Sequence, residues 1–272
     1  MTTKDLLYQP PVFGLLEGLY YFLCNEGKQN EKQLEKYFIE EQDTINNYLI
    51  PLEDLGLIKR ENDTVQIVEG NVIKYWDKNP DTFSRYFKLQ IISSIHTSPA
   101  KEIKYFSYFL ESAFQVSLVT DEDIDRYLQE ARKKVGIEDK TESMLVAKID
   151  YTKQLLKYLG ILYTHEIKSK KSQLYILLPQ EILKLSLELA VSELIKSGAN
   201  IHIDLYAQLF KKVSELYYPF LNEDRELLQS IQFAVTKNNQ LSDKFTYVLT
   251  PDGGKEIRIH GSNYNQILVG DN

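Results

Sequence analysis

The chain has 272 residues, of which 43% are hydrophobic and 26% are charged, and its formal net charge is −7. This composition is ordinary for a globular protein and excludes global disorder, and the length suits two or three small cores. The acidic balance counts against a protein that coats nucleic acid non-specifically, because phosphate binding requires concentrated Lys and Arg. Cys24 is the single cysteine, which excludes an intrachain disulfide and a cysteine-cluster zinc site and favours a reducing, cytoplasmic setting.

The N-terminal region predicts a helix over residues 12–26, whose apolar run is too short to span a bilayer and lacks the pattern of a signal peptide. The apolar stripe of this helix is predicted to consist of Leu15, Leu19, Phe22 and Leu23. A second helix follows, because Asn30 is placed to cap it. Its inner face is predicted to consist of Leu34, Tyr37 and Phe38. A third helix over about 43–55 and a strand at 64–68 complete this region.

The next region predicts a helical linker over 77–98. Ser98-Pro99 has the form of an N-cap followed by proline at the first helical position, and it opens an aromatic helix over 99–116. Thr120 and the aspartate three residues later have capping-box form and begin a further helix. Helices therefore dominate the middle of the chain.

One pattern occurs twice, at residues 45–67 and at residues 149–176. In each, an amphipathic helix runs into Leu-Gly and two apolar residues, and a short charged loop and an alternating strand follow. Gly56 and Gly160 each stand just past the helix, where glycine adopts positive φ without a Cβ clash, closes the helix and turns the chain into a strand. The pattern resembles the third helix and wing of a winged-helix domain, and its recurrence resembles tandem winged-helix proteins.

The predicted fold class is mainly α with short β-hairpins (α+β). The resemblance implies winged-helix domains at 1–76 and 99–178, joined by the linker at 77–98. Residues 179–272 predict a C-terminal helical domain that ends in a β-hairpin, an order that also permits a third winged-helix-like unit. The elements expected there are a helix from Pro179, helices near 203–217 and 222–237, and hairpin strands around 245–249 and 256–260.

The two predicted winged-helix domains differ in charge. Residues 28–62 carry five cations and eight anions, a balance of −3, and their third helix has neither Lys nor Arg. That helix would be repelled by phosphates in a major groove. Asn46 and Asn47 can in principle bind adenine edges, although solvation is the simpler explanation. Residues 140–176 carry seven cations and three anions, a balance of +4, so DNA contact is predicted for the second domain.

The lysines of the second domain fall in two places. Lys153 and Lys157 lie one helical turn apart, and a lysine run falls at the expected wing tip, which in winged helices commonly lies on the sugar-phosphate backbone. Tyr151 and Thr152 are expected at the groove-facing start of the helix. The alternative is that the lysine-rich tip is a solvated edge that prevents strand pairing. The candidate nucleic-acid-binding residues are Lys148, Tyr151, Thr152, Lys153, Lys157, Lys168, Lys170 and Lys171.

No nucleotide-binding, metalloprotease or hydrolase motif occurs in the sequence, so no catalytic residue, cofactor or metal is predicted. The predicted function is that of a non-enzymatic, DNA-associated protein similar to winged-helix transcriptional regulators. The alternative is an adaptor, similar to subunits of chromosome-condensing or bacterial defence complexes, that binds a protein partner through the acidic first domain and helix 99–116. No membrane partner is predicted. Homodimerisation is compatible with a regulator, although no heptad run supports it.

Overall fold

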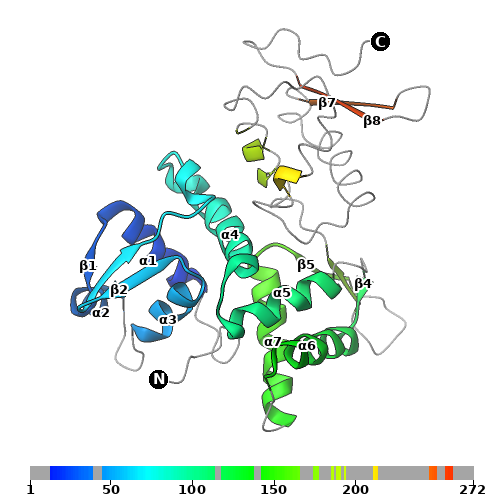
Figure 1. Ribbon diagram of the computed structural model, residues 1–272, viewed down its shortest axis with the longest axis horizontal. Coiled ribbons are helices and arrows are strands. Elements are labelled where there is room, and N and C mark those ends of the chain that lie inside the picture. The colour runs from blue at the N-terminus through cyan, green and yellow to red at the C-terminus, as the bar shows by residue number, and fades with distance from the viewer. Residues whose placement is uncertain are drawn as a thin grey trace. The chain divides into compact units, whose positions relative to one another are not determined.

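The structure is a computed structural model that describes most of the first two thirds of the chain and short stretches beyond. The described residues are 13–38, 45–113, 118–137, 142–165, 174–177, 185–186, 188–190, 193, 211–213, 245–249 and 255–259. The chain divides into two compact units, Met1–Pro179 and Gln180–Asn272. The described elements are mostly helices, with small antiparallel sheets, which confirms the predicted mainly α class with short hairpins (Figure 1).

We call the first group of elements the first module. It consists of α1 (Phe13–Glu26), β1 (Gln29–Asn30), α2 (Glu31–Phe38), α3 (Asn46–Asp54), β2 (Ile58–Glu61) and β3 (Thr64–Ile67). The three strands form an antiparallel sheet in the order β1-β3-β2. The N-terminus of α2 is capped as expected, because the side-chain oxygen of Asn30 accepts a hydrogen bond from the Lys32 N–H over 3.0 Å.

A second group repeats the same order of helices and strands, and we call it the second module. It consists of α5 (Lys101–Ala113), β4 (Leu118–Val119), α6 (Asp121–Val135), α7 (Glu142–Tyr158), β5 (Leu162–His165) and β6 (Leu174–Leu177). Its sheet order, β4-β6-β5, corresponds strand for strand to that of the first module. The capping box predicted at the start of α6 is present, with the Asp123 N–H donating to Thr120 Oγ1 and the Thr120 N–H donating to the Asp123 carboxylate.

The repeated pattern of the sequence is a repeated helix ending. Gly56 and Gly160 both have a φ of 70°, as predicted. The amide after each glycine donates to the carbonyl five residues earlier, from Leu57 to Leu52 over 2.8 Å and from Ile161 to Leu156 over 2.9 Å. This is the hydrogen bond of a Schellman motif, which satisfies carbonyls at the helix end and turns the chain into the following strand.

Strands β1 and β4 were not expected from the sequence. Each has two residues and pairs with the last strand of its module, Gln29 with Val65 and Leu118 with Ile176. A two-residue strand shows no alternation of apolar and polar residues, so it leaves no periodic signal. These short strands tie the start of the second helix of each module to its hairpin.

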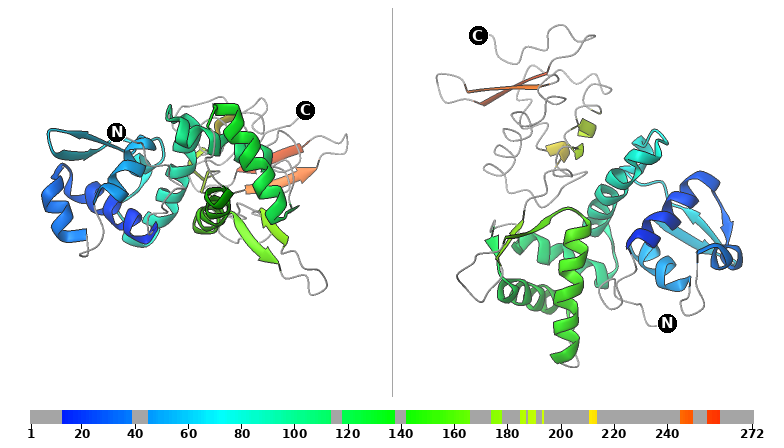
Figure 2. Two further views of the ribbon diagram at one scale, coloured as in Figure 1. Left: turned by 90° about the horizontal axis from the view of Figure 1, so that it is seen from below. Right: turned by 180° about the vertical axis from the view of Figure 1, so that it is seen from behind.

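The modules are joined by η1 (Ile73–Tyr75) and α4 (Pro80–Thr97). Helix α4 packs on α1 of the first module and on α5 of the second, and it lies between the two modules in every view (Figures 1 and 2). Its buried Gln90 accepts the N–H groups of Val72 and Ile73 over 2.8 and 3.1 Å, which satisfies two buried amides of the connection. The linker is therefore part of the core.

The apolar faces of α1 and α2 differ from the prediction. The buried residues of α1 are Leu16, Leu19, Tyr20 and Leu23. Leu15 is instead 40% exposed, and Tyr37 of α2 is 74% exposed. The buried stripe is turned toward Tyr20 because α4 covers that side of α1, where the Tyr20 ring meets Phe87 with centroids 5.1 Å apart. Periodicity alone does not reveal this second partner helix.

The second unit contains the predicted terminal hairpin. Strands β7 (Phe245–Leu249) and β8 (Lys255–Ile259) pair antiparallel, as the turn residues between them indicated. The helix expected from Pro179 is described only in fragments, the helices near 203–217 and 222–237 lie almost entirely outside the described residues, and so does most of the expected third winged-helix-like unit. In the described part of the chain, no helix combines the length and apolar character that crossing a membrane requires.

Candidate nucleic-acid interface

Five of the eight candidate DNA-binding residues lie on α7, the third helix of the second module. They are Lys148, Tyr151, Thr152, Lys153 and Lys157. The other three, Lys168, Lys170 and Lys171, lie outside the described residues. The described strands on either side of them are paired, with His165 opposite Leu174. In the sequence, the lysine run therefore connects two antiparallel strands.

Of the four candidates whose side chains the structure describes, Lys157 has the most accessible charge. It is exposed, near the end of α7, and among the described residues it forms no ion pair. Helix α7 carries no arginine, so it lacks the guanidinium fork with which proteins commonly bind guanine, and the exposed charge of Lys157 suits contact with phosphate.

Lys153 is bound within its own module. Its ammonium group lies 3.0 Å from a carboxylate oxygen of Asp121, at the start of α6, and 3.2 Å from one of Asp150. Its side chain is only 17% exposed. Both carboxylates reduce the positive potential that Lys153 offers to a polyanion. The helical spacing that placed Lys153 beside Lys157 gave no sign of Asp121, because Asp121 belongs to another helix.

Thr152 and Tyr151 lie in the middle of α7, since the helix begins at Glu142. Thr152 has no exposed surface, and the expectation that it faces a DNA groove does not fit this position. Its neighbours one turn later, Leu155 and Leu156, are buried as well, so Thr152 shares the core-facing side of the helix. Tyr151 is half-buried.

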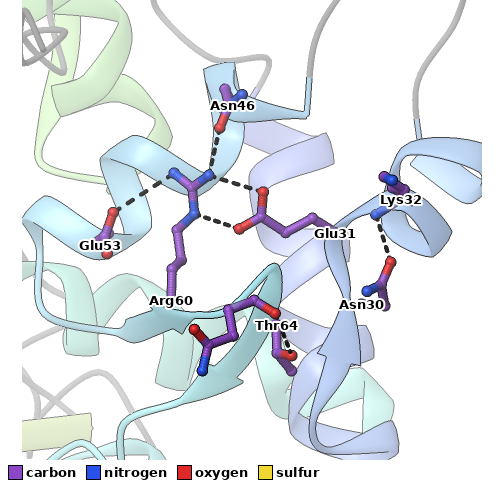
Figure 3. A network of polar contacts seen from close by, with 8 residues as sticks. Asn30, Glu31, Lys32, Asn46, Glu53, Arg60 and Thr64 are labelled. Carbon is purple, nitrogen blue, oxygen red and sulfur yellow. Dashed lines mark hydrogen bonds and ion pairs between the residues drawn. The ribbon is translucent and has the colours of Figure 1, made fainter.

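The first module contains a polar cluster around Arg60 of β2 (Figure 3). The guanidinium donates to both carboxylate oxygens of Glu31 over 2.9 and 3.0 Å and to the side-chain oxygen of Asn46 over 2.8 Å. Glu53 lies 3.7 Å away on α3. The hydrogen bonds to Glu31 raise the pKa of Arg60. The bidentate pair is the strong form of this interaction and links α2 to β2, while the contacts of Arg60 with Asn46 and Glu53 add α3.

This cluster occupies the side chains with which the first module would meet DNA. Asn46, at the start of α3, already accepts a hydrogen bond from Arg60. Arg60 is in turn bound by Glu31. A phosphate approaching Arg60 would compete with the carboxylates of Glu31 and Glu53.

The aromatic residues of α5 form the core of the second module. Tyr105, Phe106 and Phe109 have at most 2% of their surface exposed, and the rings of Phe106 and Phe109 stack with centroids 5.4 Å apart. Tyr108 is half-exposed and lies under the ammonium group of Lys134, 5.1 Å from its ring centroid. The expectation that helix 99–116 offers aromatic residues to a protein partner is therefore not supported, because α6 packs on them.

Among the described residues, no group of three or more His, Cys, Asp or Glu side chains is arranged to hold a metal ion. No protein-family model matches the chain, and comparisons with curated proteins and with solved structures give no significant match.

Proposed function

We propose that the protein is a non-enzymatic, DNA-associated tandem winged-helix protein whose second module binds the DNA backbone. The support from the fold is the order helix, strand, helix, helix, hairpin, which occurs in both modules with the same strand order. In DNA-binding helix-turn-helix proteins, a helix lies in the major groove and neighbouring elements contact the phosphates. In this proposal α7 and the β5–β6 hairpin take these roles.

The observation that carries the proposal is the pairing of β5 with β6 directly after α7. It brackets Lys168, Lys170 and Lys171 between two antiparallel strands, and the preceding helix presents the exposed Lys157. Four lysines in one helix-and-hairpin unit supply the concentrated charge that phosphate binding requires.

The site that we propose contains fewer residues than the eight candidates. The charge of the site comes from Lys148, Lys157 and the three lysines between β5 and β6. Tyr151 stays a candidate because part of its surface is exposed. Thr152 is removed because it is buried, and Lys153 contributes less because Asp121 and Asp150 bind it.

The proposal is tested by fluorescence anisotropy with a short labelled duplex at low and moderate salt. Substitution of Lys168, Lys170 and Lys171 by Glu should lower the affinity at least about tenfold and reduce the dependence of affinity on salt, because fewer counterions are released. The matched control is Lys32→Glu with Lys36→Glu, two exposed lysines on α2 of the first module. Wild-type affinity in the triple variant would exclude the proposal.

A second candidate function is protein binding by the first module, in an adaptor. It is favoured by Tyr37, which is 74% exposed on α2 and lies near Phe22, with ring centroids 6.3 Å apart. Exposed aromatic residues are enriched where proteins meet, and an acidic surface suits a basic partner. Affinity capture from the native host, with Tyr37→Ser as the comparison, tests this function. A stoichiometric partner that the variant fails to retain would support it, and a wild-type chain that elutes alone would count against it.

A further inference from the structure

Tyr158, the last residue of α7, contacts residues far away in the sequence. Its hydroxyl donates a hydrogen bond to a carboxylate oxygen of Glu17 in α1 over 2.5 Å. Ser84 of α4 donates to the same oxygen over 3.1 Å. One carboxylate of the first module thus accepts hydrogen bonds from the linking helix and from the end of α7.

The aromatic ring of Tyr158 also makes contacts, in addition to the hydrogen bond of its hydroxyl group. Phe13 of α1 stacks on it, with centroids 4.8 Å apart and planes inclined by 12°, and Lys88 Nζ of α4 lies 5.0 Å from its centroid. Stacked rings and a cation over a ring are both favourable contacts. Burial, with a smaller contribution from Glu17, raises the pKa of the Tyr158 hydroxyl.

We infer that Tyr158 is a positioning residue. Through it, the first module holds the end of α7 in a fixed orientation, and the first module does not contact the DNA. We call the residues that form this contact the α7 clamp. They are Phe13, Glu17, Ser84, Lys88 and Tyr158. The link to DNA rests on the proposed function. A helix that is ordered before it binds loses less conformational freedom on binding, and its affinity is correspondingly higher.

In this proposal, the α7 clamp gives the acidic first module a role in DNA binding, which is to orient α7. Lys153 ties the middle of α7 to α6 within the second module, whereas Tyr158 ties its end to α1 and α4. Lys157 directly precedes Tyr158 and remains exposed, so the clamp orients the helix at the position that carries the accessible charge.

The first test measures hydrogen exchange along α7 in the full-length chain, without DNA. Tyr158→Phe keeps the ring and removes the hydroxyl, and Glu17→Gln keeps the side-chain shape and removes the charge. Both should make the amides of α7 exchange about three to ten times faster than in the wild type, because one hydrogen bond to a charged acceptor is lost or weakened. The matched control is Tyr127→Phe, whose hydroxyl contacts only the exposed Arg126 over 3.3 Å among the described residues. Unchanged exchange of α7 in both variants would overturn the inference.

The second test measures affinity for the labelled duplex in the same variants. Tyr158→Phe and Glu17→Gln should each weaken binding about three- to tenfold and leave the slope of affinity against salt unchanged, because the lysine contacts are retained. The double variant should bind about as weakly as Tyr158→Phe alone, since the two changes act on the same hydrogen bond. Wild-type affinity in both variants would overturn the link to DNA binding. If the wild-type chain binds no duplex, the proposed function fails, and the exchange measurement alone decides the positioning role of Tyr158.

Discussion

The first and second modules have the same order of elements but use their charged residues differently. In both, the second helix begins with an acidic residue that binds a cation of the same module, Glu31 with Arg60 and Asp121 with Lys153. The first module binds its cation further with Asn46 and the second with Asp150. Each module also has exposed lysines, Lys32 and Lys36 on α2 of the first and Lys157 on the third helix, α7, of the second. The shared architecture therefore places an acidic residue at the same point of both modules, while its cationic partner comes from strand β2 in the first module and from helix α7 in the second.

The two modules also differ in how they use aromatic residues. Tyr105, Phe106 and Phe109 of α5 lie in the core of the second module, whereas Tyr37 of the first module faces solvent. The largest expected effect tests this difference. Phe109→Ala should lower the free energy of unfolding by about 3–5 kcal/mol, because it leaves a cavity among fully buried rings. Tyr37→Ala should change it by less than about 0.5 kcal/mol. Urea denaturation followed by circular dichroism measures both, and similar costs for the two variants would contradict the assignment of α5 to the core.

The acid–cation pairs should differ in strength. In the first module the side chains of Arg60 and Glu31 are 22% and 20% exposed and form two parallel hydrogen bonds, so Glu31→Gln should cost about 1–2 kcal/mol. In the second module Asp121 is 51% exposed, and Asp121→Asn should cost at most about 0.5 kcal/mol. Chemical denaturation of the two variants in one buffer gives the comparison. An Asp121→Asn cost equal to that of Glu31→Gln would show that the two pairs are equivalent.

The helix caps of the two modules should differ in how their contribution to stability depends on pH. The hydrogen bond from the Thr120 N–H, followed by those from the Thr120 hydroxyl and Arg126, lowers the pKa of Asp123. A lowered pKa stabilises the fold above the unfolded value, near 3.9, and this stabilisation is lost as the pH falls through the folded pKa. Asp123→Asn should therefore cost about 0.5 kcal/mol at neutral pH and almost nothing at about pH 2.

The corresponding cap of the first module is Asn30, whose uncharged side chain accepts the Lys32 N–H. Asn30→Ala should cost about 1 kcal/mol at neutral pH, and this cost should not change over the same range. Unfolding free energies of both variants and the wild type at the two pH values give the measurement. A cost of Asp123→Asn that stays constant into acid would contradict the charged cap.

Local hydrogen bonding made the ends of the helices predictable from the sequence. The sequence predicts Gly56, Gly160 and the capping box of Thr120 and Asp123 correctly, because each depends on neighbours within a few residues. The hairpin of β7 and β8 is predictable for the same reason, because its signal is carried by the turn residues between the two strands. The strands β1 and β4 were missed because they are too short for a periodic signal and exist only through pairing with a distant strand.

The mainly α class, the caps and the repeated helix ending can all be predicted from the order of residues. Three features depend instead on how the elements pack: Leu15 and Tyr37 face outward, Asp121 binds Lys153, and Glu17 meets Tyr158. The physical reason is that a cap is formed by groups held close along the backbone, whereas the burial of a side chain and the partner of a charge depend on which elements pack together. That choice is made by contacts between residues far apart in the chain, and no local pattern reports it.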